Sequence, residues 1–348
     1  MRNTPSMERT GPLFIAEISA NHLGSFERAK LLVSSAISSG AGAVKLQTYT
    51  ADTMTLNIDS DDFRISPSHT LWGGEKLYDL YQRAHTPWEW HSELFEICKQ
   101  AKVIGFSTPF DVSATTFLES INAPMYKVSS METGDLALIR TVAETGKPII
   151  ISTGATNWNE IEEVVETVLR TGNKDLTLLL CTSAYPADPG ETHLRRMQKL
   201  QDSFGLPVGI SDHTLGIGVS IAAIALGATV IERHITIRRT DGGPDAAFSL
   251  EPEEFKLLVD EGNRAFKSLG KSEWQFSDSE SEARRIRRSL YIVENVKKGE
   301  LISEQNIRAI RPGAGCSPKY LNQIIGKFFD KDYAKGTPMR LDFAVEND

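Results

Sequence analysis

The chain has 348 residues, of which 40% are hydrophobic and 24% charged, as in an ordinary globular protein with one large and one smaller domain. Its net charge of -8 argues against a nucleic-acid-binding surface, because such a surface needs a basic patch to neutralise phosphates. The N-terminus lacks the apolar region of a signal peptide, no apolar run is long enough to span a bilayer, and the three cysteines are far apart, so we expect a soluble cytoplasmic protein with no membrane partner.

Short β-rich runs alternate with amphipathic helical patterns over the first 270 residues. The predicted strands are 13–18, 43–48, 103–108, 125–130, 148–153, 176–182, 208–213 and 229–236. Three helical patterns between and after them end at Gly40, Gly172 and Gly270, and glycine just past the last turn is the usual C-cap. Eight strand-helix units over roughly 250 residues predict a (β/α)8 TIM barrel. An open doubly wound sheet is the alternative, but AEISANHLGS after the first strand lacks the G-x-G-x-x-G loop that it would need.

Two segments fall outside this repeat. Residues 49–86 form a long connection between the second strand and the next helix, and such connections usually cover the active site of a barrel. After Gly270 the chain becomes polar and then carries short strands with glycine turns. We therefore expect a catalytic barrel over 1–270, a linker over 271–284 and a small β-rich domain over 285–348.

Polar side chains stand at the C-terminal ends of all eight predicted strands, where barrel enzymes carry their reacting groups. In chain order these are Glu17, Lys45, Gln47, Ser107, Thr108, Lys127, Ser130, Glu132, Ser152, Thr153, Thr182, Ser183, Tyr185, Ser211, Asp212, His213, Glu232 and His234. A polar group at one strand end is more often a simple loop-facing residue than a functional one. Agreement among eight strands favours an active site.

Lys45 and Lys127 lie within strands, where a buried cation is costly unless an anion compensates it. Together with three strand-end serines they would hold a phosphate and a carboxylate by charge-assisted hydrogen bonds. These serines are Ser130, Ser152 and Ser211. Two alternatives stay open, namely ion pairing of the lysines with Glu17 or Glu132, and a lysine that forms a Schiff base as in an aldolase.

His213 and His234 end adjacent strands, so their imidazoles would lie close enough to share a divalent metal. Glu232 is in phase with His234 and is expected to point the same way. A histidine in such a place is more often simply hydrogen-bonded, which is the alternative here. Asp212 is expected to orient the imidazole of His213. Asp245 follows the eighth strand in a glycine-rich loop, which barrels often use to bind polar groups of the substrate.

Motifs along essentially the whole chain resemble those of the sialic acid synthase family. They are IAEISANHLGS, AVKLQT, FSTPFD, YKVSS, ISTGA, CTSAYPA, SDHTLG, ERHIT, GGPD and RPGAG. Members of this family condense phosphoenolpyruvate with an aminosugar aldehyde, and their TIM barrel is followed by an antifreeze-like SAF domain. The resemblance therefore implies the same fold, the same class of reaction and the same two substrates.

The resemblance also implies a role for each strand-end residue. His213 and His234 would hold a divalent metal ion, manganese or magnesium. Phosphoenolpyruvate would be bound by the set Lys45, Lys127, Ser130, Ser152, Ser183 and Ser211. Glu17 would be the acid or base near the reacting carbons, and the other substrate-binding residues would be Gln47, Glu132, Tyr185 and Asp245. Arg311 of RPGAG would reach the active site of the partner subunit in a domain-swapped homodimer.

Two segments indicate which sugar is used. LWGGEKLYDLYQRAHTPWEW and DAAFSLEPEEF resemble the branch of the family that acts on 2,4-diacetamido-2,4,6-trideoxy-L-altrose. Ser183 stands where sialic acid synthases carry an asparagine, which argues against N-acetylmannosamine. The alternatives are a synthase of N-acetylneuraminic or legionaminic acid and, from another class, a non-catalytic carbohydrate- or ice-binding module. The FRRS of the family reads IRRS here, at 286–289, so an aromatic sugar contact from this segment is not expected.

Overall fold

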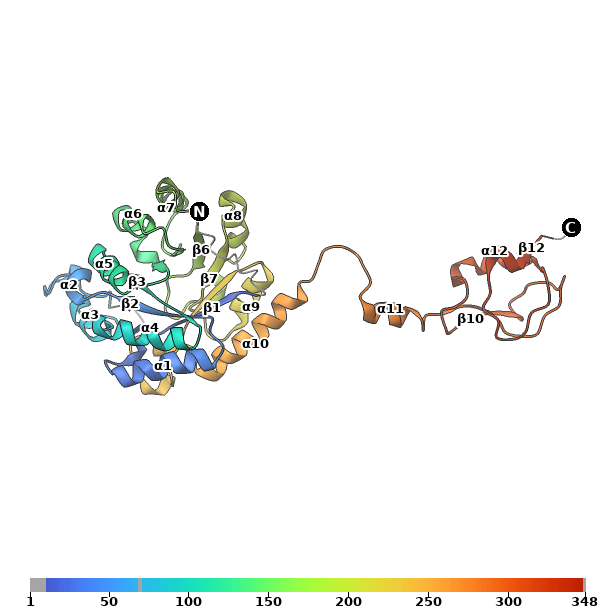
Figure 1. Cartoon of the computed structure of the whole chain (residues 1–348), viewed down its shortest axis with the longest axis horizontal. Coiled ribbons are helices and arrows are strands. Elements are labelled where there is room, and N and C mark those ends of the chain that lie inside the picture. The colour runs from blue at the N-terminus through green and yellow to red at the C-terminus, as the bar shows by residue number, and fades with distance from the viewer. Residues whose placement is uncertain (1–10, 68–70, 347–348) are drawn as a thin grey trace. The chain divides into compact units, whose positions relative to one another are not determined.

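A computed structural model describes residues 11–67 and 71–346 of the chain. Two compact units follow each other along the sequence, and the boundary between them lies between Gly270 and Lys271 (Figure 1). None of the helices in the described ranges combines the length and apolar character that a bilayer-crossing segment needs.

The first unit is a closed barrel of eight parallel strands, which confirms the predicted TIM-barrel fold. The strands are β1 (Leu13–Glu17), β2 (Ala43–Thr48), β3 (Ile104–Pro109), β4 (Tyr126–Val128), β5 (Ile149–Ser152), β6 (Leu176–Cys181), β7 (Val208–Ser211) and β8 (Val230–His234). Each strand pairs with its neighbours in the chain, and β8 pairs with β1 to close the barrel. Most strand residues are buried, as expected for a parallel sheet covered by helices on its outer face.

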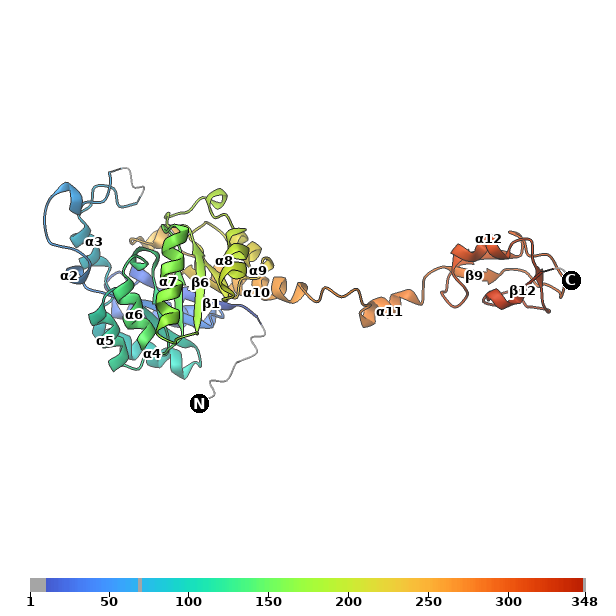
Figure 2. The same cartoon turned by 90° about the horizontal axis from the view of Figure 1, so that it is seen from above.

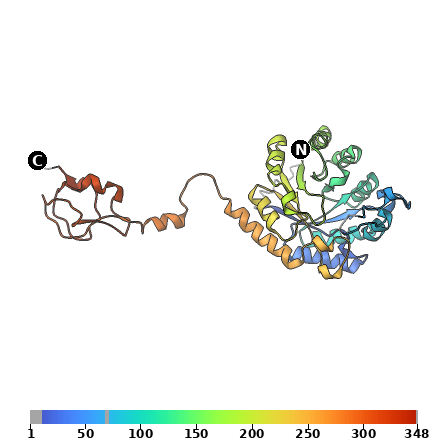
Figure 3. The same ribbon diagram turned by 180° about the vertical axis from the view of Figure 1, so that it is seen from behind.

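A ring of helices covers the barrel. Its members are α1 (Phe26–Ser38), α4 (His91–Gln100), α5 (Val112–Ser120), α6 (Leu136–Glu144), α7 (Trp158–Arg170), α8 (Arg196–Phe204), α9 (Gly218–Ala225) and α10 (Pro252–Ser268). Figure 3 shows α10 beside α1, and α10 also contacts α9, so the ring closes where the chain leaves the barrel. In α7 the buried residues Ile161, Val164, Val165 and Val168 follow helical spacing, which places one apolar face against the strands.

A glycine in β7 sets how closely three strands pack below the site. A Cβ at Gly209 would lie 2.3 Å from the carbonyl oxygen of Val230 in β8 and 2.8 Å from Leu179 in β6. No other residue fits between these strands without moving them. The register then places Ser211 beside Glu232, so that side chains at the ends of β7 and β8 enter the same space.

The connection between β2 and α4 rises over the C-terminal end of the barrel. It contains α2 (Ala51–Met54) and α3 (Leu77–Ala84), and residues 64 and 76 pair in a short antiparallel bridge. Figure 2 shows this blue segment at the same end of the barrel as the connection between β6 and α8. The position agrees with the prediction that residues 49–86 cover the site.

The second unit is small and rich in short strands, as the sequence predicts. It contains α11 (Asp278–Arg284), β9 (Ser289–Ile292), β10 (Ile307–Ile310), α12 (Leu321–Ile324), β11 (Phe328–Phe329) and β12 (Ala344–Val345). The antiparallel pairs β9–β10 and β11–β12 enclose a core of its own that includes Leu290, Ile307 and Phe329. Helix α11 lies in the segment that we expect to be a linker.

Candidate active site

A cavity of about 470 Å³ opens at the C-terminal end of the barrel. Most residues that the sequence predicts for the site line this cavity. They are Lys45, Gln47, Lys127, Ser130, Glu132, Ser152, Ser183, Tyr185, Ser211, His213, His234 and Asp245. Glu17 does not line the cavity but lies behind Lys45. Arg311 is exposed and belongs to the second unit.

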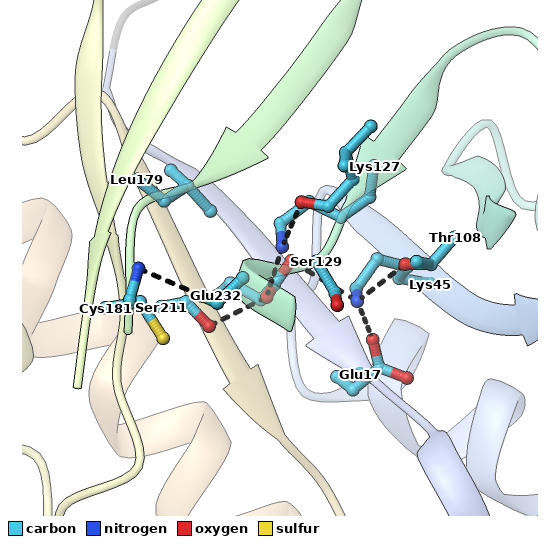
Figure 4. Close-up of polar contacts among 12 residues, drawn as sticks. Glu17, Lys45, Thr108, Lys127, Ser129, Leu179, Cys181, Ser211 and Glu232 are labelled. Carbon is cyan, nitrogen blue, oxygen red and sulfur yellow. Dashed lines mark hydrogen bonds and ion pairs between the residues drawn. The ribbon is translucent and has the colours of Figure 1, made fainter. Parts of the chain in front are cut away.

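A buried cluster of two lysines and two glutamates lies at and beneath the floor of the cavity (Figure 4). The ammonium of Lys45 pairs with the carboxylate of Glu17 and lies 3.7 Å from Oε2 of Glu232. Lys127 Nζ lies 3.7 Å from Oε1 of Glu232, and Ser211 donates a hydrogen bond of 2.8 Å to the same oxygen. The Lys45–Glu17 ion pair that the sequence left open is therefore present, and Glu232 is the group that both lysines share.

The two lysines differ in how well they are compensated. Burial lowers the pKa of Lys45, but Glu17 and Glu232 raise it further, so that it ends above its ordinary value. Burial dominates at Lys127 and lowers its pKa, because the opposing effect of Glu232 is smaller and the charge of Lys45 adds to the lowering. Burial alone would raise the pKa of Glu232, yet Lys127 and Lys45 lower it to about 2. An anionic ligand would therefore be attracted most strongly to Lys127.

Serine hydroxyls surround the lysines, and two of them have no partner within the described ranges. The Oγ atoms of Ser152 and Ser183 are buried without a hydrogen bond, whereas Ser130 Oγ accepts one of 3.0 Å from Gly154 N. A Cβ at Gly154 would lie 2.4 Å from Ser183 Oγ and 2.7 Å from Ser130 Oγ. Glycine at this position thus leaves room for the two hydroxyls. Buried polar atoms without partners, such as Ser152 Oγ and Ser183 Oγ, indicate a site that binds a polar ligand. The cluster fits an oxyanion.

His213 and His234 face each other at the side of the cavity, with ring centroids 5.3 Å apart. His213 Nδ1 lies 3.1 Å from the carbonyl oxygen of Thr182, so this nitrogen carries a proton. Burial lowers the pKa of His213, but Cys181 and the bond to Thr182 raise it further, so that it ends above its ordinary value. Burial and the nearby cations lower the pKa of His234, which keeps its ring neutral. Its Nδ1 is buried and has no partner in the part of the chain that the structure describes.

These two imidazoles fit a divalent metal ion. Neutral histidine is the form that binds metals, and the bond from His213 Nδ1 to a backbone carbonyl is the usual way to orient such a ligand. Within the described ranges no group of three or more His, Cys, Asp or Glu side chains converges as a complete protein metal site. The histidine pair would thus leave positions for substrate and water, as catalytic sites do.

The expectation that Asp212 orients His213 is wrong. Successive strand residues point to opposite faces, so that Ser211 and His213 enter the cavity while Asp212 turns outward. Asp212 Oδ2 accepts hydrogen bonds of 2.6 Å from Arg233 Nη1 and from Ser220 Oγ. Its other oxygen accepts from the backbone N and the hydroxyl of Thr214. Asp212 therefore ties the end of β7 to β8 behind the site.

Several residues at the cavity were not predicted as site residues. Glu232 was counted among the polar strand ends but received no role in binding or catalysis, and Cys181 received none either, yet both line the floor. The mouth is lined by aromatic and aliphatic residues of the 49–86 segment, such as Trp72, whose Nε1 donates to the carbonyl of Pro244 (3.0 Å). The aromatic content of this segment is the signal that a sequence could have offered, but it does not say where the side chains point.

This combination defines a class of protein. A TIM barrel whose strand ends present two buried lysines, unpaired serine hydroxyls and a pair of adjacent histidines is an enzyme site for an oxyanion and a second substrate. Comparison with known proteins narrows this class. The NeuB family matches residues 32–274 and the SAF domain matches residues 287–343. The chain therefore belongs to the NeuB family of sialic acid synthases, enzymes that condense phosphoenolpyruvate with a sugar, which confirms the resemblance of its motifs.

Named relatives span almost the whole chain. It is 42% identical to the pseudaminic acid synthase of Helicobacter pylori, over 95% of this chain and 97% of the relative. It is 37% identical to the N,N'-diacetyllegionaminic acid synthase of Campylobacter jejuni, over 94% of this chain and 98% of that one. The solved structure of an N-acetylneuraminic acid synthetase from Leptospira borgpetersenii serovar Hardjo-bovis matches with a TM-score of 0.70 at 29% identity, over 79% of this chain and 90% of the other.

Proposed function

We propose that the chain condenses phosphoenolpyruvate with 2,4-diacetamido-2,4,6-trideoxy-L-altrose to give pseudaminic acid and phosphate. The observation that carries the reaction is the oxyanion cluster of Lys45, Lys127 and the serines beside two facing histidines at one barrel mouth. The choice of sugar is supported by the identity to a pseudaminic acid synthase, 42%, against 37% to a legionaminic acid synthase. Synthesis of legionaminic or N-acetylneuraminic acid is the alternative.

Phosphoenolpyruvate would occupy the floor of the cavity. Its phosphate and carboxylate would take charge-assisted hydrogen bonds from Lys127 and Lys45 and from the surrounding hydroxyls. Those hydroxyls belong to Ser130, Ser152, Ser183 and Ser211. Because Ser211 now donates to Glu232, it would exchange this carboxylate for the ligand. The fixed lysines then offset negative charge through every later step without reorganising.

The reaction joins two carbons and releases phosphate. The C3 carbon of phosphoenolpyruvate attacks the aldehyde carbon C1 of the sugar, the carbonyl oxygen takes up a proton, and C2 gains positive character. Water adds at C2 and loses a proton, and the resulting hemiketal phosphate expels phosphate to leave the keto acid. A divalent ion, manganese or magnesium, would be held by His213 and His234 and would polarise the aldehyde as a Lewis acid.

Two glutamates have different positions for proton transfer. Glu17 is fully buried, pairs with Lys45 and accepts a hydrogen bond of 2.9 Å from Ser19 N, so it holds Lys45 in place and reaches the reacting carbons only through it. Glu132 lines the cavity, and burial raises the pKa of its carboxyl. We therefore assign to Glu132 the exchange of the water proton, because it faces the cavity and its raised pKa makes it a stronger base than an ordinary carboxylate.

Arg311 is proposed to act across a domain-swapped homodimer. Its side chain is exposed, while the following loop is packed so tightly that a Cβ at Gly315 would lie 2.0 Å from the carbonyl oxygen of Leu290. Such a fixed loop would present a cation to the sugar or phosphate of the partner's site. Co-expression of Lys127→Met and Arg311→Ala chains tests this arrangement, because only an exchanged second domain gives one intact site per mixed dimer. If the co-expressed mixture is as inactive as each variant alone, the exchange of second domains is contradicted.

A Schiff-base aldolase is a second candidate, which the lowered pKa of Lys127 favours. Borohydride with the substrates would then trap a covalent adduct, and EDTA would leave the enzyme active. The synthase is expected to lose activity in EDTA and to give no adduct.

A panel of sugars tests the proposed function directly. Purified enzyme with phosphoenolpyruvate and Mn²⁺ is expected to release phosphate with 2,4-diacetamido-2,4,6-trideoxy-L-altrose much faster than with N-acetylmannosamine or the legionaminic acid precursor. Turnover of N-acetylmannosamine alone would contradict the assignment.

A further inference from the structure

The cavity has two chemically different parts. Its floor carries the charged and hydroxyl groups of the strands, whereas the mouth beside the 49–86 segment is lined by aliphatic and aromatic side chains. Four of these, which we call the apolar wall, are Ile65, Trp72, Leu77 and Leu80. The first two stand in the hairpin before α3 and the last two in α3 itself. Nothing in the reaction described above uses the apolar wall.

Hydrogen bonds fix the apolar wall in place. Ile65 N donates to the carbonyl of Glu75 and Gly74 N donates back to the carbonyl of Ile65, both at 2.9 Å, so the hairpin is closed. Trp72 Nε1 donates to the carbonyl of Pro244, in the loop that follows β8. The hairpin that begins after β2 is thereby joined to the loop after β8, and the wall has a defined position at the mouth.

A row of rings leads from the apolar wall to the histidines. The Trp72 ring centroid is 5.8 Å from that of Tyr185, which is 4.5 Å from that of His213. Under the proposed function the aldehyde carbon C1 lies at the histidines. Polar groups of Gln47 and Asp245 line the same cavity and would meet the amide and hydroxyl groups of the sugar. The far end of the carbon chain, C6, then lies against the apolar wall.

We propose that the apolar wall selects sugars whose terminal carbon is a methyl group and rejects the same sugars with a 6-hydroxyl group. This inference rests on the proposed function. The side chains of Ile65, Leu77 and Leu80 offer no hydrogen-bonding atom, and the indole N–H of Trp72 is already donated to Pro244. A hydroxyl placed there loses its bonds to water, whereas a methyl gains by leaving water. An apolar pocket discriminates between such substrates by roughly 10- to 100-fold in kcat/KM.

A matched pair of sugars tests this selection. The pair is 2,4-diacetamido-2,4,6-trideoxy-L-altrose and its counterpart with a hydroxyl group at C6, each assayed for phosphate release with saturating phosphoenolpyruvate. The ratio of the two kcat/KM values is compared among the wild type, Leu77→Asn and Ile65→Asn. Because the ratio does not depend on the fraction of active enzyme, partial loss of folding does not alter it. Leu56→Asn is the control, since Leu56 is exposed and lies outside the cavity lining.

The wild type and Leu56→Asn are expected to prefer the 6-deoxy sugar by roughly 10- to 100-fold. Leu77→Asn and Ile65→Asn should each reduce this preference several-fold, while KM for phosphoenolpyruvate stays unchanged. If Leu77→Asn is inactive, Ile65→Asn in the hairpin decides. A ratio of kcat/KM near one in the wild type overturns the role of the apolar wall but not the proposed function. The same holds if the variants that can be measured keep the wild-type preference for the 6-deoxy sugar. Absence of phosphate release with both sugars overturns the proposed function, and this inference with it.

Discussion

Replacement of Arg233 by methionine tests how the site is held together from behind. Arg233 and Asp212 are 1% and 2% exposed, and the guanidinium bridges from Asp212 Oδ2 to the carbonyl of Thr214, with both bonds at 2.6 Å. Each of the two residues lies between two cavity-lining neighbours in the sequence. These are Ser211 and His213 for Asp212, and Glu232 and His234 for Arg233. The pair therefore fixes the two histidines relative to each other.

Methionine fills similar space but leaves the Asp212 carboxylate buried without its cation. Removing one partner of a buried ion pair costs about 3 to 5 kcal/mol, and in a barrel of this size that corresponds to a melting temperature lower by roughly 6 to 20 °C. The double variant Asp212→Leu/Arg233→Met should recover much of this loss, because no unpaired charge remains.

Urea and thermal unfolding of these variants provide the measurement, with Arg170→Met as a matched control. Arg170 pairs with Glu166 on the exposed face of α7, where an ion pair is worth about 0.5 kcal/mol or less. Calorimetric titration with Mn²⁺ should also show weaker metal binding by Arg233→Met, while Arg170→Met binds as the wild type does. If Arg233→Met destabilised the protein no more than the control, the proposed role of the pair would be refuted.

Three further predictions concern the site and the fold. Gly154→Ala places a Cβ against the hydroxyls of Ser183 and Ser130, so KM for phosphoenolpyruvate should rise at least tenfold; an unchanged KM would show that these hydroxyls do not bind it. His213→Ala should fold normally but fail to regain activity when Mn²⁺ is added after EDTA treatment, and full recovery in this variant would exclude a metal role. Burial lowers the pKa of His91 to about 4, below its usual 6.5, so the stability that its neutral ring contributes is complete above pH 6.5 and is lost as the pH falls toward 4. Between pH 7 and 5 this loss is about 2 kcal/mol. His91→Asn, although less stable at pH 7, should show a free energy of unfolding in urea that depends less on pH. An equal dependence on pH in both proteins would contradict this role of His91.

Strand ends made much of this site predictable from sequence. In a parallel barrel all C-terminal strand ends meet at one mouth, so a lysine such as Lys45 and a histidine such as His234 must converge there once the strands are recognised. The alternation of side chains along a strand also explains why the predicted role of Asp212 was wrong, since a residue between two inward-facing neighbours points outward. That Asp212 meets Arg233 depends on the register of β7 and β8, which the sequence does not state.

Other features depend on distances across the barrel. Glu232 joins Lys45 to Lys127 only because β8, β2 and β4 face one another over the barrel interior. The position of Trp72 depends on where a long connection folds back, and its bond to Pro244 links segments 172 residues apart. Hydrophobic periodicity carries no information on either contact, because both are set by tertiary packing.

The proposed condensation of phosphoenolpyruvate with a diacetamido sugar in this cavity can be followed through both of its products. Phosphate and nonulosonic acid are measured together, in the wild type and in Lys127→Met, with 2,4-diacetamido-2,4,6-trideoxy-L-altrose as the second substrate. We expect equal amounts of the two products from the wild type and neither from the variant, whose folding is checked by its melting temperature. Phosphate without the sugar acid, or undiminished synthesis by Lys127→Met, would contradict the account.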